Sequence, residues 1–141
     1  MRRLPDWPKR LVAVEERIRD WPFVWGRHDC ALATLLVLEE ITGARVGAVP
    51  GDGWSSALSA VRFIRDHGTR SLLGLADQVA GTVGLSRINP ARACRGDIVL
   101  AGEGRDEALG WIGSDGQPTF LAADGYVRHP RRAVRVAWQV P

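Results

Sequence analysis

The stretch from Trp21 to Ala31 carries the residues best suited to chemistry, because it places a cysteine where a helix is expected to begin. Cys30 would lie in the first helical turn, beside unsatisfied N–H groups and the positive end of the helix dipole. Both favour the thiolate, so we expect the pKa of this thiol to fall below its ordinary value of about 8.5. Such a cysteine is a candidate catalytic nucleophile of a hydrolase. The alternative is a small buried core residue, since unpaired cysteines are among the most buried side chains.

A nucleophilic cysteine needs a base, and the chain has three histidines. His28 precedes Cys30 by two residues and is a candidate base; the alternative is a loop histidine whose ring bonds the backbone. His129 lies in a turn between predicted strands and is a second candidate if it folds back over the site; the alternative is a solvated turn residue. His67 lies at a predicted helix end, where the dipole favours a cation. No cluster has metal-ligand spacing, so neither a metal nor a cofactor is expected.

Two separated segments carry a family resemblance. Residues 26–31 read Gly-Arg-His-Asp-Cys-Ala, and residues 95–100 read Arg-Gly-Asp-Ile-Val-Leu. Together they resemble the NlpC/P60 superfamily of papain-like cysteine peptidases and amidases, in which an Asp-Cys pair opens the central helix and a Gly-Asp pair starts the first strand. A closer resemblance is to a phage and prophage group that begins much like residues 4–8 and ends on an Ala-Trp strand, here 137–138. Genes of this group tend to lie among tail genes, near those of the tail-tip hub.

The chain departs from the family pattern at the other catalytic positions. The resemblance places the catalytic histidine at the start of the second strand, in a His-Val-Gly-Ile-like segment. The corresponding segment here is Ala-Leu-Gly-Trp-Ile, so Ala108 stands where histidine is expected. The third, orienting residue would lie on the next strand, where Leu121 and Ala122 are both apolar. The resemblance therefore implies an NlpC/P60-like scaffold with a degenerate active site.

The resemblance, with its departures at the catalytic positions, implies two alternative functions. The first is a structural component of a phage tail tip, docked to other tail-tip and hub proteins in the virion after synthesis in the bacterial cytoplasm. Tryptophan and arginine, both abundant here, are enriched at protein interfaces. The second is an active cysteine peptidase or amidase that cleaves peptide bonds of cell-wall peptidoglycan during infection, with His28 or His129 replacing the missing base.

The elements that must position Cys30 form an α+β domain. Helical spacing and capping residues predict helices over 7–19, 30–42, 54–67 and 71–80, with Asp29 as the cap of the second. Glycine and proline predict a loop over 44–53. Apolar runs and alternation predict strands over 97–101, 108–112, 119–122 and 134–140. We expect N-terminal helices with a buried central helix packed on a small antiparallel sheet, of the papain-like NlpC/P60 type.

Length and composition bound the remaining possibilities. The 141 residues, with 45% hydrophobic and 25% charged residues, predict one domain over 1–141. The 19 basic residues are scattered and form no stripe interleaved with aromatics, so nucleic-acid binding is not expected. No apolar run reaches the length of a membrane span, and no apolar segment follows the N-terminal arginines, so neither a spanning helix nor a signal peptide is expected. Cys94 has no partner motif and is expected to be a structural thiol.

Overall fold

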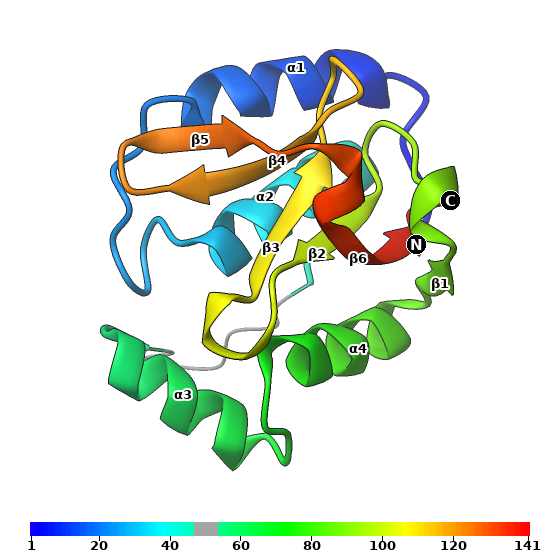
Figure 1. The fold of residues 1–141 in the computed structure, drawn as a ribbon. Helices are drawn as coiled ribbons and strands as arrows, with labels where there is room; N and C mark the ends of the chain where they lie inside the picture. The colour runs from blue at the N-terminus through cyan, green and yellow to red at the C-terminus, as the bar shows by residue number, and fades with distance from the viewer. Residues whose placement is uncertain (47–53) are drawn as a thin grey trace.

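The helix that begins at Cys30 lies at the centre of the molecule. In the computed structural model, which describes residues 1–46 and 54–141, this helix is α2 (Cys30–Thr42). Its apolar residues point in every direction, so it is covered on one side by α1 (Trp7–Ile18) and on the other by the sheet (Figure 1). Asp29 caps it and Gly43 ends it in the left-handed conformation, as predicted.

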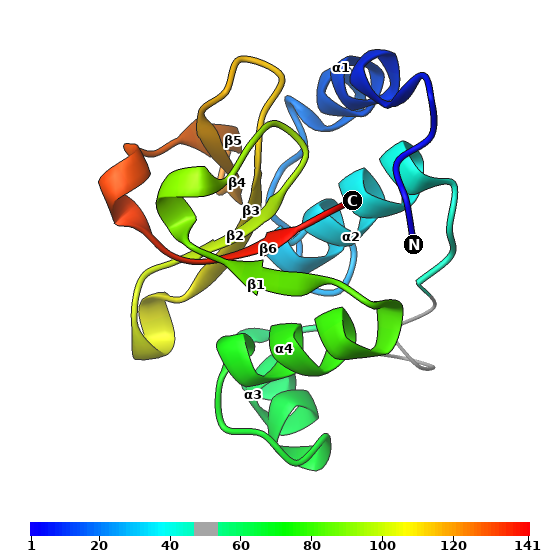
Figure 2. The same ribbon diagram turned by 90° about the vertical axis from the view of Figure 1, so that its right-hand side faces the viewer.

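The described residues form a six-stranded antiparallel sheet with the order β1-β6-β2-β3-β4-β5. The predicted α+β class, with a buried central helix on an antiparallel sheet, is confirmed. Figure 2 shows α1 and α2 on one side of this sheet and α3 and α4 below it. The strands are β1 (Ser86–Ile88), β2 (Ile98–Ala101), β3 (Ala108–Ile112), β4 (Pro118–Ala122), β5 (Gly125–Arg128) and β6 (Val134–Gln139).

Both faces of the sheet are covered. The main core joins the helices to the sheet face that carries Leu109, Trp111 and Trp138. A second cluster lies on the opposite face, around Val99, Ile112 and Phe120, and short 3₁₀ turns border it. The pairing of β2 with β6 shifts register after Leu100, and Val134 accordingly lies in the second cluster although Trp138 of the same strand lies in the main core.

The remaining helices differ from their predicted bounds. α3 (Ala57–Asp66) begins three residues later than predicted, because Ser56 caps it in a reciprocal capping box with Ser59. α4 (Leu72–Val83) runs on to Gly84, which ends it with a positive φ. Asp6 occupies the N-cap position of α1, but its side chain makes no capping hydrogen bond and pairs with Arg10 instead.

Two strands were not predicted, and one predicted loop is described only in part. The strands β1 and β5 were missed, because each is short and largely exposed. Of the predicted loop 44–53, residues 44–46 have no regular secondary structure and 47–53 lie outside the described residues. Within residues 1–46 and 54–141, no helix combines the length and apolarity needed to traverse a bilayer.

The two ends of the chain meet beside the start of β2. The Arg3 amide donates to the Pro141 carbonyl at 2.7 Å. Asp97, which is 2% exposed, accepts from the Arg3 guanidinium at 2.7 Å and from the amides of Cys94 at 2.8 Å and Val140 at 3.0 Å. The carboxylate therefore forms the predicted turn before β2 and also binds both terminal segments.

Candidate functional site

Asp29 organises the loop that leads into Cys30. Its side chain is 1% exposed and accepts from the amides of Leu32 at 2.9 Å and Gly26 at 3.0 Å, and from the indole N–H of Trp54. The sequence analysis predicted only the helix cap. The two further hydrogen bonds bind the loop and a segment 25 residues away to the same carboxylate.

Gly26 is the one position in this loop that admits no side chain. Its φ is +76°, and a Cβ built there would lie 1.7 Å from the Trp54 carbonyl oxygen. Glycine therefore allows the loop to turn sharply into α2 and the backbone of Trp54 to pack directly against it.

Cys30 lies at the first position of α2 with its thiol toward the sheet. The backbone amide of Leu109, at the start of β3, points toward the sulfur. The pKa of Cys30 is raised from 9.0 to about 11, chiefly by burial and also by the neighbouring Asp29 carboxylate, against the opposing effect of the amides of Leu109 and the helix start. The expectation of a lowered pKa is therefore wrong: desolvation of the thiolate outweighs the helix terminus.

No catalytic base stands at the matching position of β3. Ala108 is the first residue of that strand, and its side chain packs against the second cluster, on the sheet face away from α2. Leu109 is the neighbour whose side chain joins the main core on the α2 side. Residue type and side-chain direction at position 108 therefore both exclude a base for Cys30 at that position.

His28, the first candidate base, stacks on Trp21. The ring centroids lie 4.0 Å apart with an interplanar angle of 18°. Its Nδ1 is shielded from solvent and has no hydrogen-bond partner within the described residues. The backbone of His28 pairs with Val24, at 2.8 and 3.0 Å, but its ring shows no bond to the backbone of the kind considered above. The structure thus keeps His28 beside the loop into α2 with one ring nitrogen unused.

The other two histidines lie elsewhere. His129 is exposed after β5 and packs edge-on against Phe120, a residue of the second cluster, with centroids 5.1 Å apart. It is not folded back over Cys30. His67 ends α3, where its ring stacks on Phe63 and its Nδ1 lies 2.8 Å from the Phe63 carbonyl. Across the described residues, no histidine is hydrogen-bonded to the Cys30 thiol.

The apolar surroundings of Cys30 include a cavity of about 60 Å³. It lies between α2, α4 and the sheet, and Ala31 and Leu109, the two neighbours of the thiol, both line it. Trp54 forms part of its wall, whereas Trp25 is 40% exposed on the loop before α2. Cys94, expected to be a structural thiol, is exposed.

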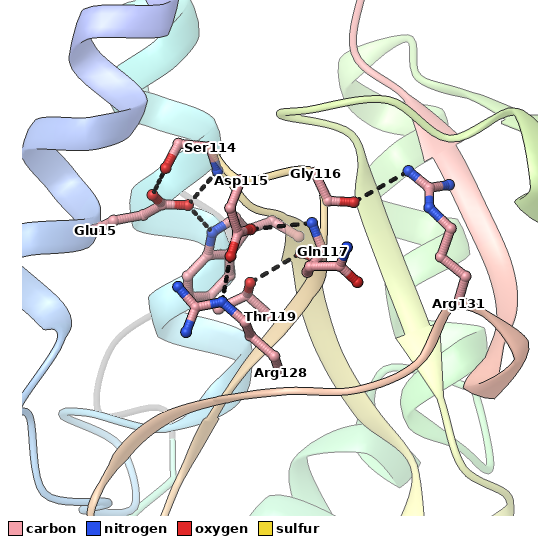
Figure 3. A network of polar contacts seen from close by, with 9 residues as sticks. Glu15, Ser114, Asp115, Gly116, Gln117, Thr119, Arg128 and Arg131 are labelled. Atoms are coloured by element: carbon pink, nitrogen blue, oxygen red, sulfur yellow. Dashed lines mark hydrogen bonds and ion pairs between the residues drawn. The ribbon is translucent and has the colours of Figure 1, made fainter.

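A buried carboxylate that the sequence analysis missed positions β3. Glu15 of α1 is 7% exposed and accepts from the Trp111 indole at 2.9 Å, and from the amide and hydroxyl of Ser114 at 3.0 and 2.5 Å (Figure 3). Next to it, Asp115 in the β3–β4 turn pairs with Arg128 at the end of β5. The available signal was position: Glu15 follows Leu11 by four residues and so falls on the apolar face of its helix.

Taken together, these observations describe an α+β domain in which the cysteine at the start of the central helix has a raised pKa and an alanine begins strand β3 beside it. The chain belongs to a family described as a domain of unknown function, DUF6950, which matches residues 2–140. Neither the curated proteins nor the solved structures that were compared gave a match. Among the described residues, no group of three or more histidine, cysteine or acidic side chains is arranged to hold a metal ion.

Proposed function

We propose that this protein is a structural component of a phage tail tip, an NlpC/P60-like domain that docks to other tail-tip and hub proteins and no longer cleaves bonds. The observation that carries the proposal is the state of Cys30. A thiol with a pKa of about 11 is almost wholly protonated at neutral pH, and the thiolate is the nucleophilic form. With an alanine directed away from it at the start of β3, nothing positioned there can remove the proton.

The exposed loop before α2 supplies a surface suited to docking. Trp25 is 40% exposed, stacks edge-on against Phe23 with centroids 4.9 Å apart, and lies beside Val24, which is also 40% exposed. Aromatic anchors of this kind contribute much of the energy of protein interfaces. The hydrogen bond from the Gly26 amide to Asp29 anchors this loop to the start of α2, and a restrained loop loses less conformational entropy on binding.

The proposal is tested with particles from cells in which the gene is deleted and then restored on a plasmid. With Cys30→Ala, we expect assembled, infective particles that contain the protein by mass spectrometry. With Trp25→Ala, we expect at least a tenfold loss of the protein from purified particles, while the purified variant remains folded. Particles that assemble normally with Cys30→Ala but fail to infect would contradict the structural role, and so would a protein never found in particles.

A second function, an active peptidase or amidase acting on peptidoglycan, is favoured by one observation. The shielded Nδ1 of His28 has no hydrogen-bond partner among the described residues, and His28 precedes Cys30 by two residues. A small movement of the ring off Trp21 would release a local base. This function predicts peptide release from purified peptidoglycan that both His28→Ala and Cys30→Ala abolish, whereas His67→Ala retains it. The structural role predicts no release above a blank from any of these proteins.

A further inference from the structure

A groove on the sheet face away from α2 takes no part in the proposed function. It lies where the end of β1 and the 3₁₀ turn η1 (Pro90–Arg92) meet the turn η3 (Arg131–Ala133). Ile88 and Ala93 line it, and both also pack in the second cluster. Its volume of about 690 Å³ falls within the range of about 300–1,000 Å³ that is usual for ligand sites.

Arginine dominates the charge around this groove. All of its lining residues belong to the segments 86–96 and 125–141, which together carry seven arginines and no acidic residue. Three of the seven pair with carboxylates of other segments: Arg87, Arg128 and Arg135. The other four form no ion pair within the described residues, and they are Arg92, Arg95, Arg131 and Arg132. Arg92 and Arg131 line the groove, so it carries positive charge that the fold leaves without an ion pair.

Arg131 is held in place for binding an anion. Its guanidinium donates to the carbonyls of Ala93 at 3.0 Å and Gly116 at 3.2 Å, and Figure 3 shows the second of these bonds. A guanidinium has five N–H donors, so three remain for a ligand. Because its position is already fixed, it loses little side-chain entropy on binding. Such a planar group matches the two oxygens of a carboxylate.

The rest of the lining favours a polypeptide as the occupant. Ile88, Ala91 and Ala93 provide apolar surface between the polar side chains. No aromatic side chain of the described residues lines the groove, so the bases of a single-stranded nucleic acid would have nothing to stack on. Asp97, the carboxylate nearest in sequence, is buried and binds Arg3, so it does not compete for the arginines of the groove.

We propose that this groove binds a short, extended acidic segment of a partner protein, with carboxylates on Arg92 and Arg131. Alternate side chains of an extended segment point the same way, so its acidic residues can face the arginines together. Charge complementarity of this kind speeds association and excludes basic partners. The groove is thus a second interaction surface, separate from the loop before α2.

Binding is measured by fluorescence anisotropy with a rhodamine-labelled hexapeptide in which glutamate and leucine alternate. We expect saturable binding, and at least tenfold weaker binding when glutamine replaces glutamate in the peptide. Arg92→Gln and Arg131→Gln should each weaken binding at least fivefold, because each removes a charge that lines the groove. Arg62→Gln, the same change at an exposed position of α3 outside the groove, should leave binding unchanged.

Cys94 reports where the peptide binds. Its thiol is exposed and it lines the groove, so a saturating concentration of the peptide should slow its alkylation by iodoacetamide at least fivefold in Cys30→Ala protein. If Arg131→Gln does not fold, Arg92→Gln and this alkylation rate decide the matter, because the Arg92 side chain is exposed and forms no ion pair within the described residues.

The proposal is overturned by the absence of saturable binding, or by equal affinity for the glutamate and glutamine peptides. Equal weakening by Arg62→Gln and Arg92→Gln would reduce the effect to net charge and would also reject it. An unaltered alkylation rate of Cys94 at saturation would show that the peptide binds elsewhere. Tighter binding of a single-stranded oligothymidylate than of the acidic peptide would reject the polypeptide in favour of a nucleic acid. These outcomes do not depend on whether the protein is found in phage particles.

Discussion

Replacing Asp29 with asparagine is expected to weaken the fold and activate Cys30 at the same time. The carboxylate accepts hydrogen bonds from Leu32, Gly26 and Trp54, the last two at the same oxygen. Asparagine keeps one acceptor oxygen, which can still cap α2, but its amide group would face two donors in place of the second oxygen. The substitution thus removes two charge-assisted bonds while hardly changing side-chain volume.

The magnitude follows from those two bonds. A hydrogen bond to a charged group contributes about 1.5–3 kcal/mol, and an unsatisfied buried donor costs about 1–3 kcal/mol. The Trp54 indole is buried, while the Gly26 amide is partly buried, so we expect a loss of about 3 kcal/mol. This is a large part of the about 5–15 kcal/mol that stabilises a domain. Asp20→Asn, at an exposed position before the same loop, should change stability by less than about 0.5 kcal/mol.

Two measurements on the same variant test the reasoning. Urea unfolding at pH 7 gives the free energy of unfolding. Alkylation by iodoacetamide against pH, in a Cys94→Ala background because Cys94 is exposed, gives the thiol pKa. The Asp29 charge raises the pKa of Cys30, so Asp29→Asn should lower it from about 11. A stability change under about 1 kcal/mol, or an unaltered thiol pKa in a folded variant, would refute the role assigned to this carboxylate.

Three further predictions concern the buried ionisable groups. With Cys94→Ala as the only change, Cys30 should be alkylated slowly at neutral pH and reach its half-maximal rate near pH 11. A midpoint at or below the ordinary value of about 8.5 would instead show that Cys30 is an activated nucleophile. Folding raises the pKa of Cys30, so burial of the neutral thiol contributes fully to the free energy of unfolding below pH 9.0. That contribution, at most about 3 kcal/mol, is lost as the pH rises through about 11. Urea unfolding across this pH range should show the decline in the unaltered protein and not in Cys30→Ala. Glu15→Ala should lower the free energy of unfolding measured in urea by about 3 kcal/mol, because it leaves the buried Trp111 indole without an acceptor. Glu16→Ala, at the exposed next position, should leave that free energy almost unchanged.

The sequence alone was sufficient where structure is local. Both ends of α2 follow from Asp29 and Gly43, whose capping roles depend on residues within one helical turn. The strand β2 was predicted from its own apolar run, and the turn before it is likewise local, because the Asp97 side chain closes it on the Cys94 amide. The short strands β1 and β5 gave no such signal, because three or four largely exposed residues show no alternation.

The properties of the candidate site depend on contacts between distant segments. Asp29 differs from an ordinary helix-capping aspartate because it also accepts from the Trp54 indole, which lies 25 residues further along the chain. The pKa of Cys30 was predicted in the wrong direction because the helix start is a local feature, while the burial that dominates comes from the packing of α2 on the sheet. The direction of Ala108 likewise depends on the register of β3, which its own five residues do not specify.

The meeting of the two chain ends beside Asp97 makes the fold a nearly closed loop. The Arg3 amide and the Pro141 carbonyl are already hydrogen-bonded at 2.7 Å, so a short glycine-rich bridge could join the termini without moving the core. New ends could then be opened in the exposed turn around Gly104–Asp106, between β2 and β3. A circular permutant of this kind would keep the loop before α2 intact and would present it at a different distance from whatever is fused to the new ends.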